Sequence, residues 1–396
     1  MASLETKEKK PLNEKLKLMD KIADDINNKA GKKIMGRLGR KEDVEGGILD
    51  RLRIKFIPTP SRNFNAATGG GFPRGRTSII VGEEDSGKTS LALETIGYNQ
   101  RRDPDFTAGW LESEDSLEED YLVNTMGIDL DRFTLIQQQR KDAGEAALDR
   151  LEACIASGAY DMIVVNSLKA LVPSEEFKKS ISDGVVGVQA RMNARMTRKY
   201  TSPVSESETS FIIITHLSND IGKMFGDPLV ISGGKAIQYA SSLTVDLRKR
   251  SITDDDPISK EDGIKIGVTV KKNHCVPDRN PYVKTQYYAI FGEGIEQYLT
   301  ALEAGIEQGI LVKAGSHIKD VDENGEVRTL PDSNSTKLQF RGKKAFVEYC
   351  KDNPEYFKDL QLRIDGLTET MSAEEIEEVE KEQKEIEEEV KEVDKK

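Results

Sequence analysis

The residues with the most specific chemistry are the eight at 82–89, GEEDSGKT. They end an apolar run, TSIIVG, and open a helical pattern. A glycine-rich loop between a strand and a helix presents backbone N–H groups to phosphates, so Lys88 would reach the β- and γ-phosphates of a nucleotide. Thr89 would ligate Mg²⁺. The other phosphate-binding positions are Gly82, Glu83, Glu84, Asp85, Ser86, Gly87 and Ser90. A chance match in a glycine-rich turn is the alternative, and both flanks count against it.

Acids and a histidine end two further strand-like stretches. Glu112 and Glu114 close WLESE, and His216 closes FIIITH. The carboxyl ends of parallel strands meet at one edge of a sheet, where ligands bind. One of the two acids could therefore polarise a water that attacks a γ-phosphate. The residues alone leave a structural role equally open for each of the three side chains.

These residues need a scaffold that brings strand ends together, and the sequence predicts one. Apolar runs alternate with helical patterns, which is typical of an α/β fold with a mostly parallel, twisted sheet flanked by helices. Strands are expected at 77–82, 107–115, 160–173 and 210–218, and helices at 91–102, 143–157 and 186–201. Three more strands without long helices between them predict an antiparallel extension, at 240–250, 263–273 and 284–291. An amphipathic helix at 11–30 and a short strand at 52–59 would precede this core.

The composition limits the class of protein. Three single cysteines among 396 residues form neither a metal motif nor a disulfide framework, which favours a reducing cytoplasm. The sequence contains neither an apolar signal segment nor a run of about 20 apolar residues, so no membrane association is expected. The formal net charge of −12 argues at first against nucleic acid as a partner.

The position of the charge changes that argument. Residues 373–396 hold twelve acids and five lysines, a net charge of −7, whereas residues 1–41 carry +6 and the remainder −11. The acidic tail is expected to be solvated and disordered. It is either a solubilising segment or an internal polyanion that competes for basic sites.

Several short stretches together resemble one known family. They are GKKIMGRLG, GFPRGR, GEEDSGKTSLAL, IVVNSLKALVP, MFGDP with SGGKA, FGEGI and KDNPE. Their order and spacing are similar to those of the bacterial RecA recombinases and their phage relatives, over about residues 20–365. The resemblance implies a P-loop RecA-like core that uses ATP and Mg²⁺. It further implies a DNA-dependent ATPase that forms helical filaments on single-stranded DNA, pairs it with homologous duplex and exchanges strands during repair.

The resemblance also implies an organisation, partners and a location. We expect an N-terminal polymerisation helix and strand at 1–60, an ATPase core at 61–296, a small C-terminal α/β domain at 297–372 and the tail at 373–396. Single-strand-binding and mediator proteins would be further partners. The protein would act in the cytoplasm, of a bacterial cell or of a phage host.

Roles at the nucleotide site carry over by position. Glu114 matches the water-activating glutamate, and His216 stands where the bacterial family has a γ-phosphate-sensing glutamine. Tyr121 matches the aromatic that stacks on adenine, with Glu118 beside the base. Lys272 matches a lysine that reaches into the neighbouring subunit's ATP site. Gly292, within FGEGI, is expected at the same interface.

Two loops would bind DNA, at about 178–187 and 217–234. Their cations would contact phosphates without reading sequence, while apolar side chains wedge between bases and glycines permit close approach. Without the resemblance, Met224 and Phe225 would be interpreted as buried anchors of the loop. The positions are Val186, Gly187, Arg191, Arg195, Arg198, Lys199, Lys223, Met224, Phe225, Gly233, Gly234 and Lys235.

The sequence departs from the family pattern at four places. Asn166 replaces an aspartate that in P-loop enzymes contacts Mg²⁺ indirectly, through the ligands of the metal. The replacement predicts weaker Mg²⁺ binding and slower hydrolysis, in part offset by the nearby Glu112. His274 replaces a second interface lysine and predicts a pH-dependent ATPase. Ser218 and Asp220 replace basic residues of the second loop, whereas Lys223 is an added cation. The insertion at 319–337 has no functional interpretation.

Two other functions share this core. A hexameric helicase would form a closed ring instead of an open filament. An ATP-dependent DNA-binding scaffold or regulator would hydrolyse ATP poorly, and Asn166 gives that alternative some weight. Turnover on single-stranded DNA separates the scaffold from a recombinase.

Overall fold

The computed structural model describes residues 11–31, 33–36, 54–138, 143–178, 187–219, 229–253, 258–276, 282–322, 324–329 and 337–364. Two compact units contain them. The first is built from the described parts of 1–59, 65–249 and 267–285, and the second from those of 60–64, 250–266 and 286–396. No helix in the described ranges is long and apolar enough to cross a membrane.

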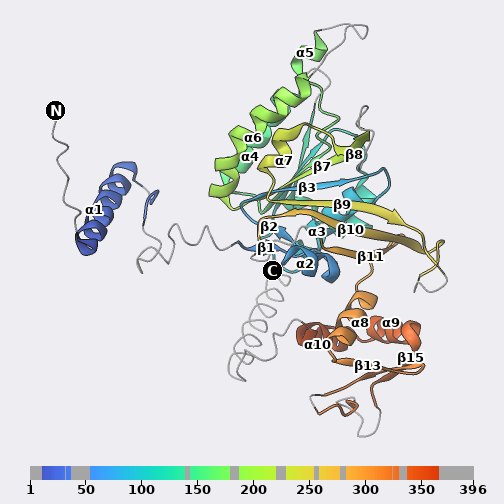
Figure 1. Cartoon of the computed structure of the whole chain (residues 1–396). Coiled ribbons are helices and arrows are strands. Elements are labelled where there is room, and N and C mark those ends of the chain that lie inside the picture. Colours follow the sequence, from blue (N-terminus) through green and yellow to red (C-terminus); the bar gives the residue numbers. More distant parts are fainter. Residues whose placement is uncertain are drawn as a thin grey trace, which may run out of the picture. The chain divides into compact units, whose positions relative to one another are not determined.

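The large sheet confirms the predicted fold class. Its strand order is β12-β11-β10-β9-β3-β7-β6-β4-β5, with β8 paired to β7. Figure 1 shows β9, β3 and β7 side by side in this order. The neighbours from β9 to β5 are parallel. The strands are β3 (Thr77–Gly82), β4 (Ala108–Glu112), β5 (Phe133–Gln137), β6 (Met162–Asn166), β7 (Ser210–Asn219), β8 (Leu229–Ile231), β9 (Leu243–Arg250), β10 (Gly263–Asn273), β11 (Lys284–Ile290) and β12 (Gly294–Ile295).

Helices cover both faces of the parallel part. On β3, Ile79 and Val81 pack with the helices α4 and α6, while Ile80 between them is buried on the opposite face, the side of α3. Burial on both faces explains why these strands are apolar throughout. The helices of the first unit are α1 (Leu12–Ala30), α2 (Arg62–Thr68), α3 (Lys88–Gln100), α4 (Gly144–Ser157), α5 (Ser174–Phe177), α6 (Val188–Ser207) and α7 (Lys235–Ala240), α2 being shared with the second unit.

The predicted antiparallel extension is confirmed for β10 and β11. It is wrong for β9, which pairs parallel with β3 and so belongs to the parallel part of the sheet. The N–H of Phe291 donates to the carbonyl of Asp262 at 2.9 Å, and that of Val270 donates to Val283 at 2.9 Å. The start of β10 therefore lies opposite the end of β11. The hairpin continues into β12, which pairs antiparallel with β11.

Some elements differ from the prediction. Strand β6 ends at Asn166 instead of 173, because the chain turns there and the N–H of Leu168 bonds to Ile214 on β7. The expected strand at 52–59 is reduced to β1 (Phe56–Ile57), which pairs with β2 (Phe72–Pro73). Strand β5 and the helices α2 and α7 were not predicted from the sequence.

The C-terminal part of the second unit is a small α/β arrangement. Three strands, β13 (Leu311–Ala314), β14 (His317–Asp320) and β15 (Gln339–Arg341), form an antiparallel sheet. The helices α8 (Tyr298–Glu307), α9 (Gly342–Asp352) and α10 (Pro354–Ile364) share one apolar core with it. The predicted acidic tail at 373–396 lies outside the described residues.

Candidate functional site

The loop between β3 and α3 has the geometry of a phosphate cradle. A Cβ added to Gly82 would lie 2.3 Å from the carbonyl oxygen of Leu247, so only glycine fits there. Gly87 has a φ of +80° and precedes Lys88, the first residue of α3. The loop closes on the carbonyl of Glu83, which accepts from Ser86 Oγ at 2.8 Å and from Lys88 Nζ at 2.5 Å.

Lys88 is buried at the base of this loop, with 6% of its surface exposed. Burial lowers the pKa of its ammonium, while the carboxylates of Glu114 and Asp85 act in the opposite direction. A buried cation that has a carbonyl as its partner is stabilised by an anion such as a phosphate group. The loop and the lysine together therefore favour a phosphate ligand.

Two pairs of strand ends lie next to the loop. Glu112 on β4 pairs in register with Asn166 on β6, and Gly82 on β3 pairs with His216 on β7. Glu112 is buried and accepts hydrogen bonds from Trp110 Nε1 at 2.8 Å and Asn166 Nδ2 at 3.2 Å. It also accepts from the backbone N–H two residues further on, at 2.6 Å. The Glu112 carboxylate is thereby fixed beside Asn166.

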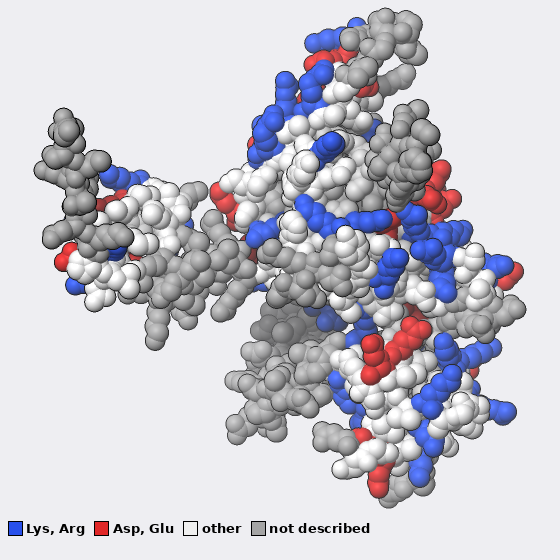
Figure 2. Space-filling view, viewed as in Figure 1, with Lys and Arg blue, Asp and Glu red and all other residues white. Residues whose placement is uncertain are grey.

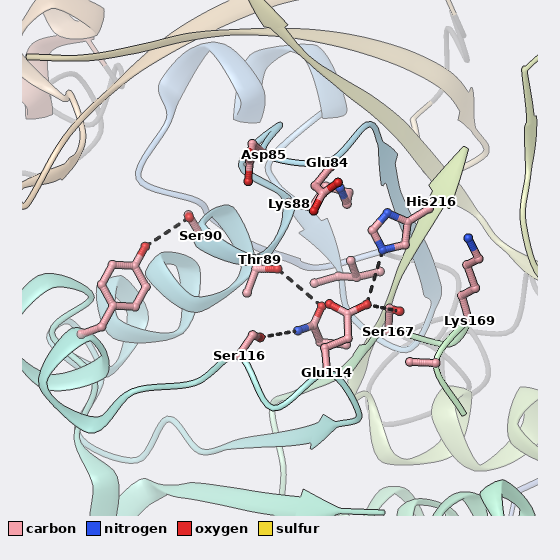
Figure 3. Close-up of a pocket in the computed structure, with 14 residues that line it drawn as sticks. Glu84, Asp85, Lys88, Thr89, Ser90, Glu114, Ser116, Ser167, Lys169 and His216 are labelled. Carbon is pink, nitrogen blue, oxygen red and sulfur yellow. Dashed lines mark hydrogen bonds and ion pairs between the residues drawn. The ribbon is translucent and has the colours of Figure 1, made fainter. Parts of the chain in front are cut away.

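Glu114 and His216 meet across the pocket. Glu114 Oε1 accepts from Ser167 Oγ at 2.5 Å and lies 3.4 Å from His216 Nε2 (Figure 3). Both side chains are partly exposed, with 32% and 28% of their surfaces accessible. A partly solvated carboxylate held by two neighbours is suited to accept a proton from a water molecule.

One pocket of about 770 Å³ collects most of the predicted nucleotide residues. Of these, Glu84, Asp85, Lys88, Thr89, Ser90, Glu114, Tyr121, Asn166 and His216 line it. Five further residues that were not predicted line it too: Ser116, Ser167, Lys169, Ala170 and Ile214. Ser116 lies just beyond the strand predicted at 107–115, so the strand-end rule that identified Glu114 could have found it. Ser167, Lys169 and Ala170 fell inside the strand predicted at 160–173, and only the end of β6 at Asn166 brings them to the pocket.

Tyr121 and Ser90 lie together at one end of the pocket, whereas Glu118, Lys272 and Gly292 are not among the residues that line it. The hydroxyls of Tyr121 and Ser90 share a hydrogen bond of 3.2 Å, whereas Glu118 is exposed. Lys272 Nζ donates to the carbonyls of Gln238 at 2.8 Å and Tyr239 at 3.1 Å, near the end of α7. Burial lowers its pKa. Gly292, in the second unit, forms a turn with a φ of +77°.

The predicted DNA-binding residues are only in part described. Val186, Lys223, Met224 and Phe225 lie outside the described residues. Cations gather over α6 (Figure 2), where Arg191, Arg195, Arg198 and Lys199 are exposed. Arg191 pairs with Glu175 at 3.0 Å, and Lys199 pairs with Asp149 at 3.0 Å and Glu152 at 2.6 Å.

The end of the second predicted loop is bonded to the helix that follows the first. Asn193 Nδ2 on α6 donates to the carbonyl of Gly233 at 2.9 Å. Gly233 and Gly234 have φ of +103° and +93°, a backbone that strongly favours glycine. Lys235, at the start of α7, is exposed, while Gly187 caps the start of α6.

The side chains around Thr89 fit a magnesium ion that is held largely by nucleotide phosphates. Thr89 Oγ1 lies 3.4 Å from Asn166 Oδ1, and the buried Glu112 carboxylate lies behind that amide. Within the described ranges, His, Cys, Asp and Glu form no cluster of three that could hold a metal alone. A hydroxyl and a polarised amide oxygen suit Mg²⁺ bound mainly through phosphates and water.

The fold and this pocket define a P-loop α/β protein. The family model of the RecA N-terminal domain matches residues 17–296. The chain is 32% identical over 353 residues to Protein RecA of Saccharopolyspora erythraea, covering 89% of this chain and 92% of that one. It is 34% identical over 351 residues to Protein RecA of Bacteroides thetaiotaomicron, covering 88% and 96%. Protein RecA of Thermus aquaticus is 32% identical over 354 residues, covering 88% and 94%. The chain therefore belongs to the RecA family of recombinases.

Proposed function

We propose that the protein is an ATP-dependent homologous recombinase that forms helical filaments on single-stranded DNA and exchanges strands with homologous duplex. The observation that carries the proposal is the junction at His216. This residue lies in the pocket with Lys88 and Glu114, and the chain runs from it directly into the second predicted DNA loop.

The pocket residues have separate roles in ATP hydrolysis. Lys88 and the N–H groups at the start of α3 bind the phosphates, and Tyr121 stacks on the base. Glu114 orients a water and takes up its proton, while Ser167 and His216 hold the carboxylate in place. Bound Mg²⁺, with Thr89 and Asn166 beside it, would supply positive charge against the phosphate oxygens.

Hydrogen bonds connect the γ-phosphate position with the DNA loop. The carbonyl of His216 accepts from the N–H of Ser232 at 3.0 Å, and Thr215 Oγ1 donates to the carbonyl of Ser232 at 3.2 Å. The second loop thus begins within the strand that carries His216, and its far end is hydrogen-bonded back to that strand at Ser232. A change at His216 on ATP binding would order the loop and raise DNA affinity, as in other nucleotide switches.

The filament supplies the remaining parts of the site. Lys272 and Gly292 would contact the nucleotide of the neighbouring protomer, and residues 1–60 would dock on that protomer. Arg195 and Arg198 would contact DNA phosphates. The acidic tail would compete with DNA for such cations and slow access to duplex.

ATP turnover with and without single-stranded DNA tests this proposal. Wild-type protein should hydrolyse ATP faster on DNA, and Lys88→Ala should abolish both turnover and ATP-dependent DNA binding. DNA binding with negligible turnover would support the scaffold alternative, for which Asn166 is the favouring observation. Closed rings in electron micrographs, instead of filaments, would support the helicase.

A further inference from the structure

The turn that follows β6 adds a second lysine to the nucleotide pocket. Lys169 lines this pocket together with Lys88, three residues beyond Asn166. Its side chain is exposed, and within the described residues no hydrogen bond or ion pair engages its ammonium. Figure 3 shows Lys169 on the His216 side of the pocket, away from Ser90. It is therefore a cation available to a ligand at the end of the pocket where the γ-phosphate would lie.

The charge of the pocket gives this lysine a function. Three carboxylates, of Glu84, Asp85 and Glu114, line the pocket against two lysines. A nucleoside triphosphate brings about four negative charges, of which Mg²⁺ offsets two. Lys88 alone would face this anion among three acids, so a second cation lowers the repulsion at the terminal phosphate.

The turn is held by the helix that follows the first predicted DNA loop. Gln189, in the first turn of α6, donates from Nε2 to the carbonyls of Lys169 at 2.7 Å and Leu168 at 3.1 Å. Two further bonds fix the turn, from the N–H of Ala170 to Ser167 and from that of Leu168 to Ile214. The backbone of Lys169 is thus fixed while its ammonium stays available.

We propose that Lys169 binds the terminal phosphate of a nucleoside triphosphate in the same protomer, and that Gln189 is its positioning residue. This inference rests on the proposed function and deepens it, because it assigns a second phosphate-binding residue. It also connects the phosphate end of the pocket to α6 by a route that does not pass through His216.

Calorimetric titration of the full-length protein with Mg²⁺ tests the inference, using ADP and the non-hydrolysable β,γ-imido analogue of ATP. Lys169→Met should raise the Kd of the triphosphate about tenfold, as expected for loss of one charge-assisted hydrogen bond, and that of ADP less than about twofold. Lys169→Arg should restore triphosphate binding. The exposed Lys313→Met, which removes the same charge from β13, should change neither Kd.

Three results would overturn it in distinguishable ways. Wild-type binding with an unchanged Kd in Lys169→Met, or an equal change for both nucleotides, overturns the inference alone. Failure of the wild-type protein to bind either nucleotide overturns the proposed function as well. Gln189→Ala should weaken the preference for triphosphate only when Lys169 is present; an equal effect in the Lys169→Met background contradicts the positioning role.

Discussion

Asn166→Asp should destabilise the metal-free protein, because it places a second carboxylate against a buried one. Asn166 and Glu112 are 1% and 3% exposed, and Asn166 Nδ2 lies 3.2 Å from Glu112 Oε2. Two unit charges at that distance repel by about 5 kcal/mol at an effective dielectric constant of about 20. Proton uptake limits this loss of stability. At pH 7, protonating one carboxyl with an ordinary pKa costs about 4 kcal/mol, which is less than the repulsion between two charged carboxylates.

Because the folded variant takes up a proton, its loss of stability depends on pH. The shared proton raises a carboxyl pKa in the folded state, so stability is lost as pH rises above the unfolded pKa. The loss should be about 4 kcal/mol at pH 7 and about 1.5 kcal/mol at pH 5, since each pH unit contributes about 1.4 kcal/mol. Added Mg²⁺ should recover part of it, because a cation beside the pair would offset the repulsion between the carboxylates.

Urea unfolding of the wild-type and variant proteins with a chelator, at pH 5, 7 and 8, measures this loss. The control is Glu112→Gln combined with Asn166→Asp, which keeps one carboxylate in the pair and should recover at least half of it. If Asn166→Asp matches the wild-type free energy of unfolding within about 1 kcal/mol at pH 8, the reasoning is refuted. A double variant no more stable than the single one would contradict it as well.

Three further perturbations have defined outcomes. Glu114→Gln should lower ATP turnover by a factor of about 10² or more and leave the Kd of ATP within about threefold, as kinetics and calorimetry would show; unchanged turnover excludes Glu114 as the base. Burial raises the pKa of Glu296, which caps α8, to about 7, so its contribution to stability is lost between about pH 4.5 and 7 as pH rises. Glu296→Gln should remove up to about 3 kcal/mol of that pH dependence from urea unfolding, and identical profiles would refute the assignment. Deleting 373–396 should speed nucleation on DNA and lower the Mg²⁺ required; equal nucleation rates would leave the tail without this role.

The sequence predicted the parallel strands well because burial on both faces makes them continuous apolar runs. The run at 77–82 corresponds to β3 residue for residue. The parallel strand β5, which is largely exposed, has no such run and was not predicted. The antiparallel β10 matches its pattern at 263–273. Strand ends then indicated where Glu114 and His216 lie, whereas Asn166 was identified by the family resemblance, within a strand expected to continue to 173. This part of the pocket follows from local pattern and one topological rule.

Contacts between residues far apart in the sequence could not be predicted from local pattern. Lys169 was placed within a predicted strand, and only the turn after Asn166 brings it to the pocket. The carbonyl partners of Lys272 come from α7, a helix of six residues that has too little periodicity to predict. The bonds of Gln189 and Asn193 to distant backbone carbonyls depend on how α6 packs, which no sequence pattern encodes.

A three-strand exchange assay shows whether this pocket drives DNA strand exchange. A single-stranded circle and homologous linear duplex are incubated with the protein, with and without ATP and Mg²⁺, alongside Lys88→Ala. We expect joint molecules only for the wild-type protein with ATP, together with filaments on the single strand. Joint molecules formed equally by Lys88→Ala, or none formed by wild-type protein that binds ATP and DNA, would contradict it.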